Sequence, residues 1–375
     1  MRQAVYLDYN ATVPLRPQAR AALIAALDIV GNASSIHRFG RLARRSIEDA
    51  REQIAALLKV MPRQIVFTAG ATEANNGALR ATGRRRILAG ATEHPSVLAA
   101  SPAIETIPVD RAGVVDLAEL STMLATNDEP ALVSIMLANN ETGTIQPVAE
   151  AAAIAHAAGA LLHCDAVQAV GRIPLDFQAL GADLMSVSSH KMGGPTGAGA
   201  LIVRDGLALE PLLRGGGQEL SRRAGTENVA AIAGFGAAAA AASAELADEQ
   251  RRLTALRDGL ESELRAIAPV QIFGADADRL PNTSCFGLAG LASDVQVIAL
   301  DLTGIAVSAG AACSSGKVSG SPVLAAMGVE AVAAKAAIRV SLGWQNTTAD
   351  VERFLDAWRT LARRDEVKTA VAPAA

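Results

Sequence analysis

The sequence predicts an α/β protein with a mainly parallel central sheet flanked by helices. Three observations lead to this prediction. Half of the 375 residues are hydrophobic, short β-rich runs alternate with helical patterns, and small or polar residues follow several of the β-rich runs. Such alternation is typical of βαβ units. The length and apolar content suit a large domain with a smaller one attached.

The first elements are the most regular. Residues 41–60, RLARRSIEDAREQIAALLKV, have the periodicity of an amphipathic helix, and QIVFT at 64–68 follows as a strand. ATEANNGALRA at 71–81 then begins another helix. A short strand near ILAG, at 87–90, precedes a helix that starts at Pro95.

The alternation continues through ALVSIML as a strand, a helix over 148–158, and the strands LLHCDA and ADLMSVS. A long Ala-rich helical stretch runs from Val229 to Ala268. The elements after it are shorter, so we place a domain change inside this helix near residue 255. We predict a large domain of residues 16–255 and a smaller α/β domain formed by 1–15 and 256–375.

Composition excludes several classes of partner and location. The net charge of -4 and the pI near 5.8 do not favour nucleic acid or an anionic membrane as the main partner, and the Arg84–Arg86 triplet is interpreted as a solvated loop. No apolar run approaches the roughly 18 uninterrupted residues of a membrane span, and the N-terminus lacks a signal-peptide core. We therefore expect a soluble, cytoplasmic protein.

The cysteines are predicted to act as individual thiols. Cys164, Cys285 and Cys313 are too few and too scattered for a disulfide framework, and no CxxC pair suggests zinc or another metal. Cys164 and Cys285 lie in strand-like segments typical of small core residues. Cys313 lies among small and turn-forming residues with Lys317 nearby, a setting that favours an exposed, reactive thiolate.

Polar groups gather where the predicted strands end. Gly70, Ala71 and Thr72 follow a strand at a helix start, where free N–H groups favour an anion, although packing alone also explains such turns. Asp165 in HCDAVQ is suited to a protonated heterocyclic nitrogen or, alternatively, to a helix N-cap. Lys191 in SSHK is either a nucleophilic amine or a residue that closes a strand before a turn.

Together these strand ends offer an anion site, a carboxylate and an amine. Strand ends of a parallel sheet meet at one crevice. A phosphate site, an acid for a pyridine nitrogen and an amine for a Schiff base are the groups that hold pyridoxal 5′-phosphate.

The chain resembles the cysteine desulfurases, which belong to the class V aminotransferases. The resemblance extends from Tyr6 to the last helix and depends on motifs in a fixed order: YLDYNATVPL, FTAGATEANN, TEHPSV, ANNETG, HCDAVQAVG, SSHKMGGPTGAGAL, GGGQE, RRAGTENV, SAGAACSSG and IRVSLG. It implies a homodimeric fold-type I pyridoxal-phosphate transferase. Such an enzyme takes sulfur from L-cysteine, releases L-alanine and leaves a persulfide on its own cysteine.

The resemblance assigns roles to the strand-end residues. It implies that Lys191 forms the Schiff base, that Asp165 pairs with the pyridine nitrogen, and that His94 stacks on the ring and moves protons. An isolated histidine is otherwise a structural residue more often than a catalytic one. Gln168 and Asn140 are expected to contact the phenolic oxygen and the substrate region.

The same resemblance assigns residues to the cofactor phosphate, the substrate carboxylate and the transferred sulfur. Ala71, Thr72, Ser188 and His190 are expected to hold the phosphate, with Thr226 reaching it from the other subunit. Arg339, in a predicted strand, is expected to bind the substrate carboxylate through its planar fork, although a surface arginine is the alternative. Cys313 is expected to carry the persulfide on a mobile loop at about 308–321.

Other functions stay open at this point. A selenocysteine lyase shares nearly every site, and an aminotransferase or carbon–sulfur lyase of the same fold needs no mobile cysteine. A non-catalytic binding module is the structural alternative. The sulfur acceptor is expected to be an iron–sulfur scaffold protein, with a thiolation partner as the second candidate.

Overall fold

The protein is built around a seven-stranded sheet. The computed structural model describes residues 4–211, 213–309 and 320–371. The strands lie in the order β2 (Ile65–Thr68), β8 (Gly199–Val203), β7 (Leu184–Ser188), β6 (Leu161–Asp165), β5 (Ala131–Ser134), β3 (Arg86–Gly90) and β4 (Ile104–Ile107). All pairs from β7 to β4 are parallel, and β8 is antiparallel to both of its neighbours. The mainly parallel sheet is therefore confirmed.

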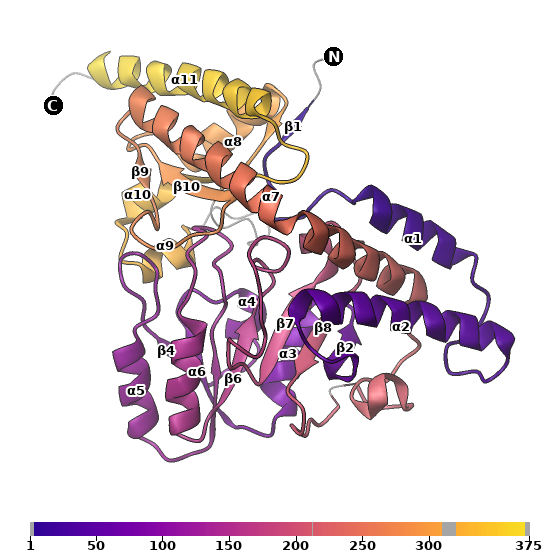
Figure 1. Ribbon diagram of the computed structural model, residues 1–375. Helices are drawn as coiled ribbons and strands as arrows, with labels where there is room; N and C mark the ends of the chain where they lie inside the picture. The colour runs from indigo at the N-terminus through magenta and orange to yellow at the C-terminus, as the bar shows by residue number, and fades with distance from the viewer. Residues whose placement is uncertain (1–3, 212, 310–319, 372–375) are drawn as a thin grey trace.

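Helices cover both faces of this sheet (Figure 1). One core joins a strand face to the helices α2 (Arg38–Leu58), α5 (Leu117–Ala125), α6 (Val148–Ala157) and the first half of α7 (Val229–Ile267). Residues of α3 (Ala71–Ala81) and α4 (Pro95–Leu98) cover the opposite face. The helix α1 (Pro17–Leu27) packs along α7. With both faces buried, the strands carry nearly continuous apolar runs, which explains their strong sequence signal.

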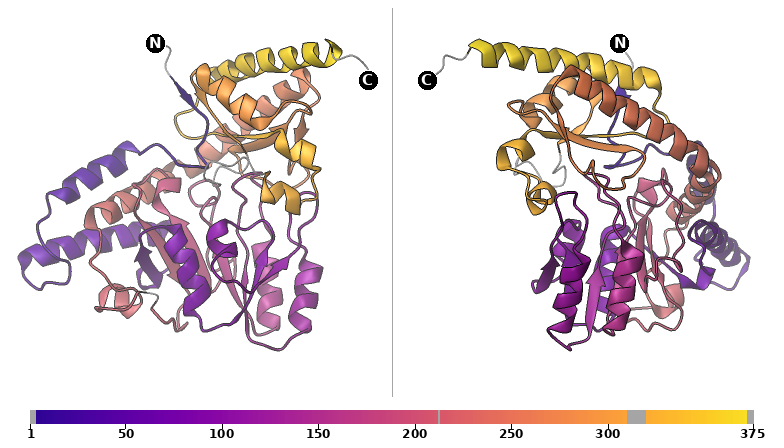
Figure 2. Two further views of the ribbon diagram at one scale, coloured as in Figure 1. Left: turned by 180° about the vertical axis from the view of Figure 1, so that it is seen from behind. Right: turned by 60° about the vertical axis from the view of Figure 1, so that its left-hand side comes forward.

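A second, smaller group of elements surrounds an antiparallel sheet. Its order is β12 (Ser308–Ala309), β13 (Ala337–Ser341), β10 (Thr283–Gly287) and β9 (Gln271–Ile272), and β1 (Val5–Tyr6) pairs beside it with β11 (Ile305–Ala306). The accompanying helices are α8 (Ser293–Leu302), α9 (Pro322–Ala326), α10 (Ala331–Lys335) and α11 (Thr348–Val371). The two views in Figure 2 show this group above the large sheet.

The helix α7 contributes to both cores. Its N-terminal residues, such as Phe235, belong to the core of the large sheet, whereas Leu253, Leu260 and Leu264 belong to the core that contains Trp358. Figure 1 shows this helix running from α1 and α2 up to α11. The proposed domain boundary near residue 255 lies within this continuous helix and stays a prediction.

Two expectations from the sequence are wrong. The first is that no segment is long and apolar enough to span a membrane. By length and composition alone, α7 is such a helix, because its many alanines count as apolar. Half of its most apolar 18-residue segment is buried within the protein. Arg86 is not in a solvated loop: it begins β3, is only 5% exposed, and forms a two-point ion pair with Glu105 at 2.8 and 2.9 Å. Its guanidinium also donates to two backbone carbonyls. The ion pair and these hydrogen bonds together offset the cost of burying the charge.

A buried ion pair fixes the strand that leads into the site. Glu219, in the 3-10 turn Gln218–Ser221, accepts two hydrogen bonds from Arg51 of α2 at 2.8 and 2.9 Å. It also accepts the N–H of Phe67 in β2 at 2.8 Å. Glu219 adopts a left-handed conformation with φ 47°, which a non-glycine residue tolerates only under local restraint. This pair therefore holds β2 just before the chain enters α3.

We expect Glu219→Ala to lower the free energy of unfolding by roughly 3–5 kcal/mol, because it removes the buried partner of Arg51 and the acceptor of the Phe67 N–H, and leaves Arg51 only the half-exposed Glu48 carboxylate. The matched control is Asp205→Ala, which breaks the exposed Arg63–Asp205 pair and should cost at most about 1 kcal/mol. Urea unfolding of both variants measures the difference. Equal losses in the two variants would contradict the structural role of Glu219.

Candidate functional site

A cavity of about 630 Å³ opens at the carboxyl ends of β6 and β7 and at the N-terminus of α3. Nine residues predicted from the sequence line it together: Ala71, Thr72, His94, Asn140, Asp165, Gln168, Ser188, His190 and Lys191. They come from segments spread over residues 71–191, about a third of the described chain. The convergence follows from the sheet, because parallel strands present their carboxyl ends at the same edge.

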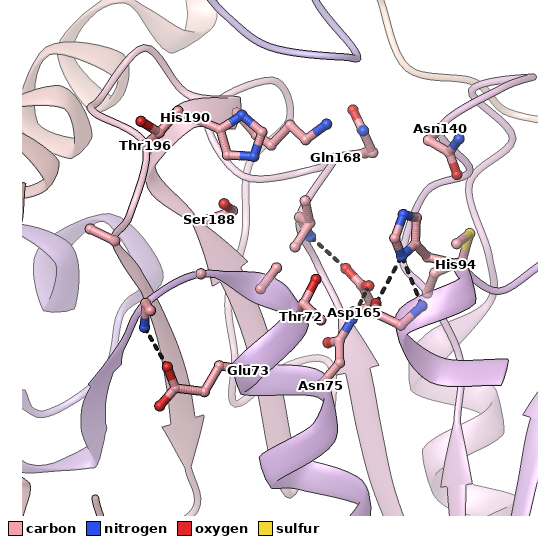
Figure 3. A pocket seen from close by; sticks show the side chains of 18 of the residues that line it. Thr72, Glu73, Asn75, His94, Asn140, Asp165, Gln168, Ser188, His190 and Thr196 are labelled. Atoms are coloured by element: carbon pink, nitrogen blue, oxygen red, sulfur yellow. Dashed lines mark hydrogen bonds between the residues drawn. The ribbon is translucent and has the colours of Figure 1, made fainter. Parts of the chain in front are cut away.

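One end of the cavity is suited to an anion. The chain enters α3 through Gly70, whose φ of 156° and ψ of 177° belong to a region that is almost restricted to glycine. A Cβ on the facing Gly199 would lie 2.7 Å from the Gly70 Cα atom, so the two backbones approach closely. The first N–H groups of a helix lack intrahelical acceptors. Thr72, Ser188 and His190 lie around this helix start (Figure 3).

The Asp165 carboxyl is buried at the base of the cavity. Its Oδ1 accepts the Val167 N–H at 3.0 Å, and its Oδ2 accepts the Asn75 side chain at 2.8 Å. Burial raises the pKa of Asp165 above its ordinary value, while these hydrogen bonds and the charges of His94 and Lys191 oppose the increase. The structure therefore surrounds a costly buried carboxylate with hydrogen-bond donors, the Lys191 ammonium and the titratable ring of His94.

His94 lies beside this carboxyl at the start of α4. Its Nδ1 accepts the Ser96 N–H at 3.1 Å and is 2.8 Å from the Ser96 hydroxyl, which in turn accepts from Asn75 at 2.8 Å. Because Nδ1 is an acceptor, the neutral ring carries its proton on Nε2. Burial lowers the pKa of His94 below its ordinary value, and nearby Lys191 adds to this, while Asp165 opposes it. The ring is therefore kept mainly neutral at pH 7.

Lys191 follows β7 in the short 3-10 turn Ser189–Lys191. Its ammonium donates to the backbone carbonyls of Asn10 at 2.5 Å and Ala11 at 2.8 Å. The Asn10 carbonyl also accepts from Gln168 at 3.0 Å. The N-terminal segment thus lies against the cavity and orients the lysine side chain.

His190, which precedes Lys191 in the chain, has a strongly lowered pKa of about 4, caused by burial and by the charges of Lys191 and Arg172. Its Nδ1 lies 3.2 Å from the Thr12 hydroxyl. A neutral imidazole can offer an N–H to an anion without carrying charge.

Two predicted residues do not line this cavity, and a third is not among the described residues. Arg339 is 2% exposed on β13 and does not line the cavity; it donates to Asp8 at 2.6 Å and to the Asn140 carbonyl at 2.9 Å. Thr226 is exposed and lines an adjoining cavity of about 160 Å³, which shares Ala69 and Gly197 with the first. Cys313 lies outside the described residues.

The interpretation of the other two cysteines is confirmed. Cys164 in β6 and Cys285 in β10 are fully buried. Burial raises the pKa of both thiols well above the ordinary value, so they remain protonated at neutral pH. Neither is suited to act as a thiolate nucleophile.

Sequence reasoning missed several residues that shape the site. Asn10, Asn75 and Ser96 were inside the motifs YLDYNA, FTAGATEANN and TEHPSV but received no role. Asn75 follows Ala71 by four residues on α3, so helical spacing places it on the cavity side and would have been the available signal. Glu93, whose pKa is raised well above its usual range by burial and by Asp165, was also overlooked.

Comparison with known proteins identifies the class. The sequence profile of the family described as Aminotransferase class-V matches residues 5–354. The solved structure of a NifS-like protein from Rickettsia africae superposes with a TM-score of 0.90 at 38% identity, covering 96% of this chain and 100% of the other. The cavity at the strand ends and the matching fold thus define a class-V aminotransferase.

Curated relatives narrow this class. A cysteine desulfurase of Gluconacetobacter diazotrophicus is 44% identical, covering 94% of this chain and 92% of the relative. An IscS-like cysteine desulfurase of Mycobacterium tuberculosis is 42% identical, with 94% coverage of both chains. The chain belongs to the cysteine desulfurase family. A further neighbour, SspA solved in complex with cysteine, has a TM-score of 0.78 at 28% identity, covering 90% of this chain and 98% of the other.

The electrostatic coupling in the cavity can be tested directly. In Asp165→Asn, we expect the pKa of His94 to fall further, because the substitution removes the one charge that opposes the effect of burial. Histidine NMR titration of the ligand-free protein measures this change. Asp176→Asn, which alters an exposed carboxyl, is the control and should not change the pKa of His94. An increase in the pKa of His94 in Asp165→Asn would refute the coupling.

Proposed function

We propose that this cysteine desulfurase uses pyridoxal 5′-phosphate to remove sulfur from L-cysteine, releases L-alanine and carries the sulfur as a persulfide on Cys313. The observation that carries the proposal is the single cavity in which Lys191, Asp165 and the N-terminus of α3 meet. Its relatives are cysteine desulfurases, and one structural neighbour was solved with cysteine.

The residues present fit the cofactor. The helix start with Thr72, Ser188 and His190 suits a phosphate, and the cavity volume lies within the usual range for such ligands. The buried Asp165 carboxyl has a raised pKa, which indicates that its charge is incompletely compensated. A protonated ring nitrogen would compensate it. When bound, pyridoxal 5′-phosphate supplies an electron sink for negative charge at the substrate Cα atom.

The side chains of this chain would divide the remaining tasks. We assign to Lys191 the bond to the cofactor and the movement of the Cα proton, since its amine is oriented at the cavity wall. His94, kept neutral by burial, can accept or return a proton near the substrate sulfur. We assign Asn140 and Gln168, which line the cavity, to the phenolic oxygen of the cofactor and to the substrate region.

Sulfur transfer itself is a displacement at sulfur. The Cys313 thiolate attacks the substrate sulfur atom, a sulfur–sulfur bond forms, and the carbon–sulfur bond breaks. The electron pair of the broken carbon–sulfur bond remains on the carbon fragment, which takes up protons and leaves as alanine. No external oxidant is needed, because the oxidation of sulfur is balanced by the reduction of the carbon fragment.

The proposal extends to assembly and location. We assign the enzyme to the cytoplasm as a homodimer in which Thr226 contacts the phosphate of the partner's site; the exposure of Thr226, and its absence from the lining of the cavity of its own chain, support this role. The persulfide would pass to an acceptor protein, for which an iron–sulfur scaffold is our first candidate.

The decisive variant is Cys313→Ser. We expect it to bind L-cysteine and change the visible spectrum of the holoenzyme, because the cavity residues are intact. It should not form a persulfide, since a serine hydroxyl is a poor nucleophile toward sulfur. Mass spectrometry after one turnover without reductant should show one added sulfur on the Cys313 peptide of the unmodified enzyme alone. Sulfur on Cys164 or Cys285, or full alanine release by the variant, would overturn the role of Cys313.

Arg339→Lys tests the carboxylate site. Lysine keeps the charge but cannot form two parallel hydrogen bonds, so we expect KM for L-cysteine to rise roughly 10-fold or more with a smaller change in kcat. Arg279→Lys is the control, because Arg279 forms a comparable two-point pair with Glu261 away from the cavity. An unchanged KM in Arg339→Lys would place the substrate carboxylate elsewhere.

A further inference from the structure

The turn formed by residues 139–142 connects the cavity to the second sheet. Asn140 lines the cavity, and its carbonyl accepts from Arg339 of β13 at 2.9 Å. The Asn139 side chain accepts the two N–H groups that follow Asn140, at 2.8 and 3.0 Å. The same side chain donates to the Thr92 carbonyl at 3.1 Å. The turn is thus held from both sides, which gives its side chains defined positions.

Glu141 extends from this turn to the beginning of α9. Its Oε2 accepts the Ser321 hydroxyl at 2.5 Å, and the Ser321 oxygen accepts the Leu324 N–H at 3.0 Å as the N-cap of α9. Both Glu141 and Ser321 are only 4% exposed. Val323 and Leu324 then pack α9 against β10 and β13. The residue next to Asn140 is therefore linked by two successive hydrogen bonds to the first turn of α9.

The burial of this carboxyl requires an explanation. Burial raises the pKa of Glu141 to about 7, although the Ser321 hydrogen bond and the charge of Arg339 oppose the increase. Among residues 4–211, 213–309 and 320–371, Glu141 forms no ion pair. A buried carboxyl without an ion pair costs folding free energy that an apolar residue of similar size would not. A contact retained at this cost is a candidate for a functional role.

We propose that Glu141 is a positioning residue for sulfur transfer, which holds the start of α9 against the turn that contains Asn140 through its hydrogen bond to Ser321. This inference rests on the proposed function of Cys313. Ser321 follows Cys313 by eight residues, a length that spans at most about 29 Å when extended. The length of the chain alone therefore does not fix the distance between the thiol and Ser321. Fixing the end of the segment raises the effective concentration of the thiol at the substrate sulfur.

The test compares Glu141→Ala, Ser321→Ala and the double variant as holoenzymes. Rapid-quench mass spectrometry gives the single-turnover rate of persulfide formation on Cys313, and hydrogen exchange reports on the α9 amides. We expect each single variant to slow persulfide formation roughly 10-fold, as for the loss of a hydrogen bond to a charged group. The double variant should be no slower than the slower single variant, because both substitutions break one contact.

Two controls separate positioning from general stability. Ser321→Thr keeps the hydroxyl and the cap and should restore the rate. Asp116→Ala removes an N-cap from the distant helix α5 and should not affect it. In all variants L-cysteine should change the cofactor spectrum as in the unmodified enzyme, because the residues assigned to binding are intact.

The possible results have distinct meanings. Normal persulfide rates with normal α9 exchange in both single variants, or additive effects in the double variant, would overturn the role of Glu141 while leaving the proposed function in place. Absence of sulfur on Cys313 in the unmodified enzyme would overturn the proposed function and this inference together.

Discussion

The burial of the Asp165 carboxyl is the constraint on which the arrangement of the site depends. A carboxylate removed from water must regain hydrogen bonds and positive charge from the protein or remain protonated. The structure provides an N–H from the following turn, the amide of Asn75, and the neighbouring groups of His94 and Lys191. Helix α3 must therefore start directly after β2, because only then does Asn75 lie above the end of β6. The same helix start provides the anion site.

The N-terminal segment joins the site to the smaller group of elements. The Asn10 carbonyl accepts from Lys191 and Gln168, while the Asn10 side chain donates to Thr283 of β10 and to the Asn140 carbonyl. Lys191 is therefore oriented by an N-terminal turn that is distant in sequence and is itself held by β10. Arg339 meets the same Asn140 carbonyl from β13. Among the described residues, the wall of the cavity comes from the large-sheet elements and from Ala11 of the N-terminal segment. The second sheet acts on this wall from behind, through the contacts of β10 and β13 with Asn10 and Asn140.

Local patterns in the sequence predicted much of this arrangement. The apolar runs and helical periodicities located the elements of the large sheet, and small or polar residues at strand ends located most of the cavity wall. The helix predicted from Pro95 exists but has only four residues. Roles taken from the family resemblance, such as those of Thr226 and Cys313, are not visible in the geometry of the described residues.

Long-range pairings could not be predicted from local patterns. The antiparallel placement of β8, the ion pair that buries Arg86, and the contacts of Asn10 depend on residues far apart in the chain. Glu141 has no distinguishing local pattern, because only the packing of α9 brings Ser321 next to it. The sequence therefore indicates which residue types are available, and tertiary packing determines which of them meet.

The most direct test of the account is to identify the lysine that bonds the cofactor. The chain contains Lys59, Lys191, Lys317, Lys335 and Lys368. Borohydride reduction of the holoenzyme makes that bond permanent, and peptide mass spectrometry then locates the modified residue. The account predicts the pyridoxyl group on Lys191 alone. Modification of any other lysine, or no modification of a protein that retains desulfurase activity, would contradict the proposed site.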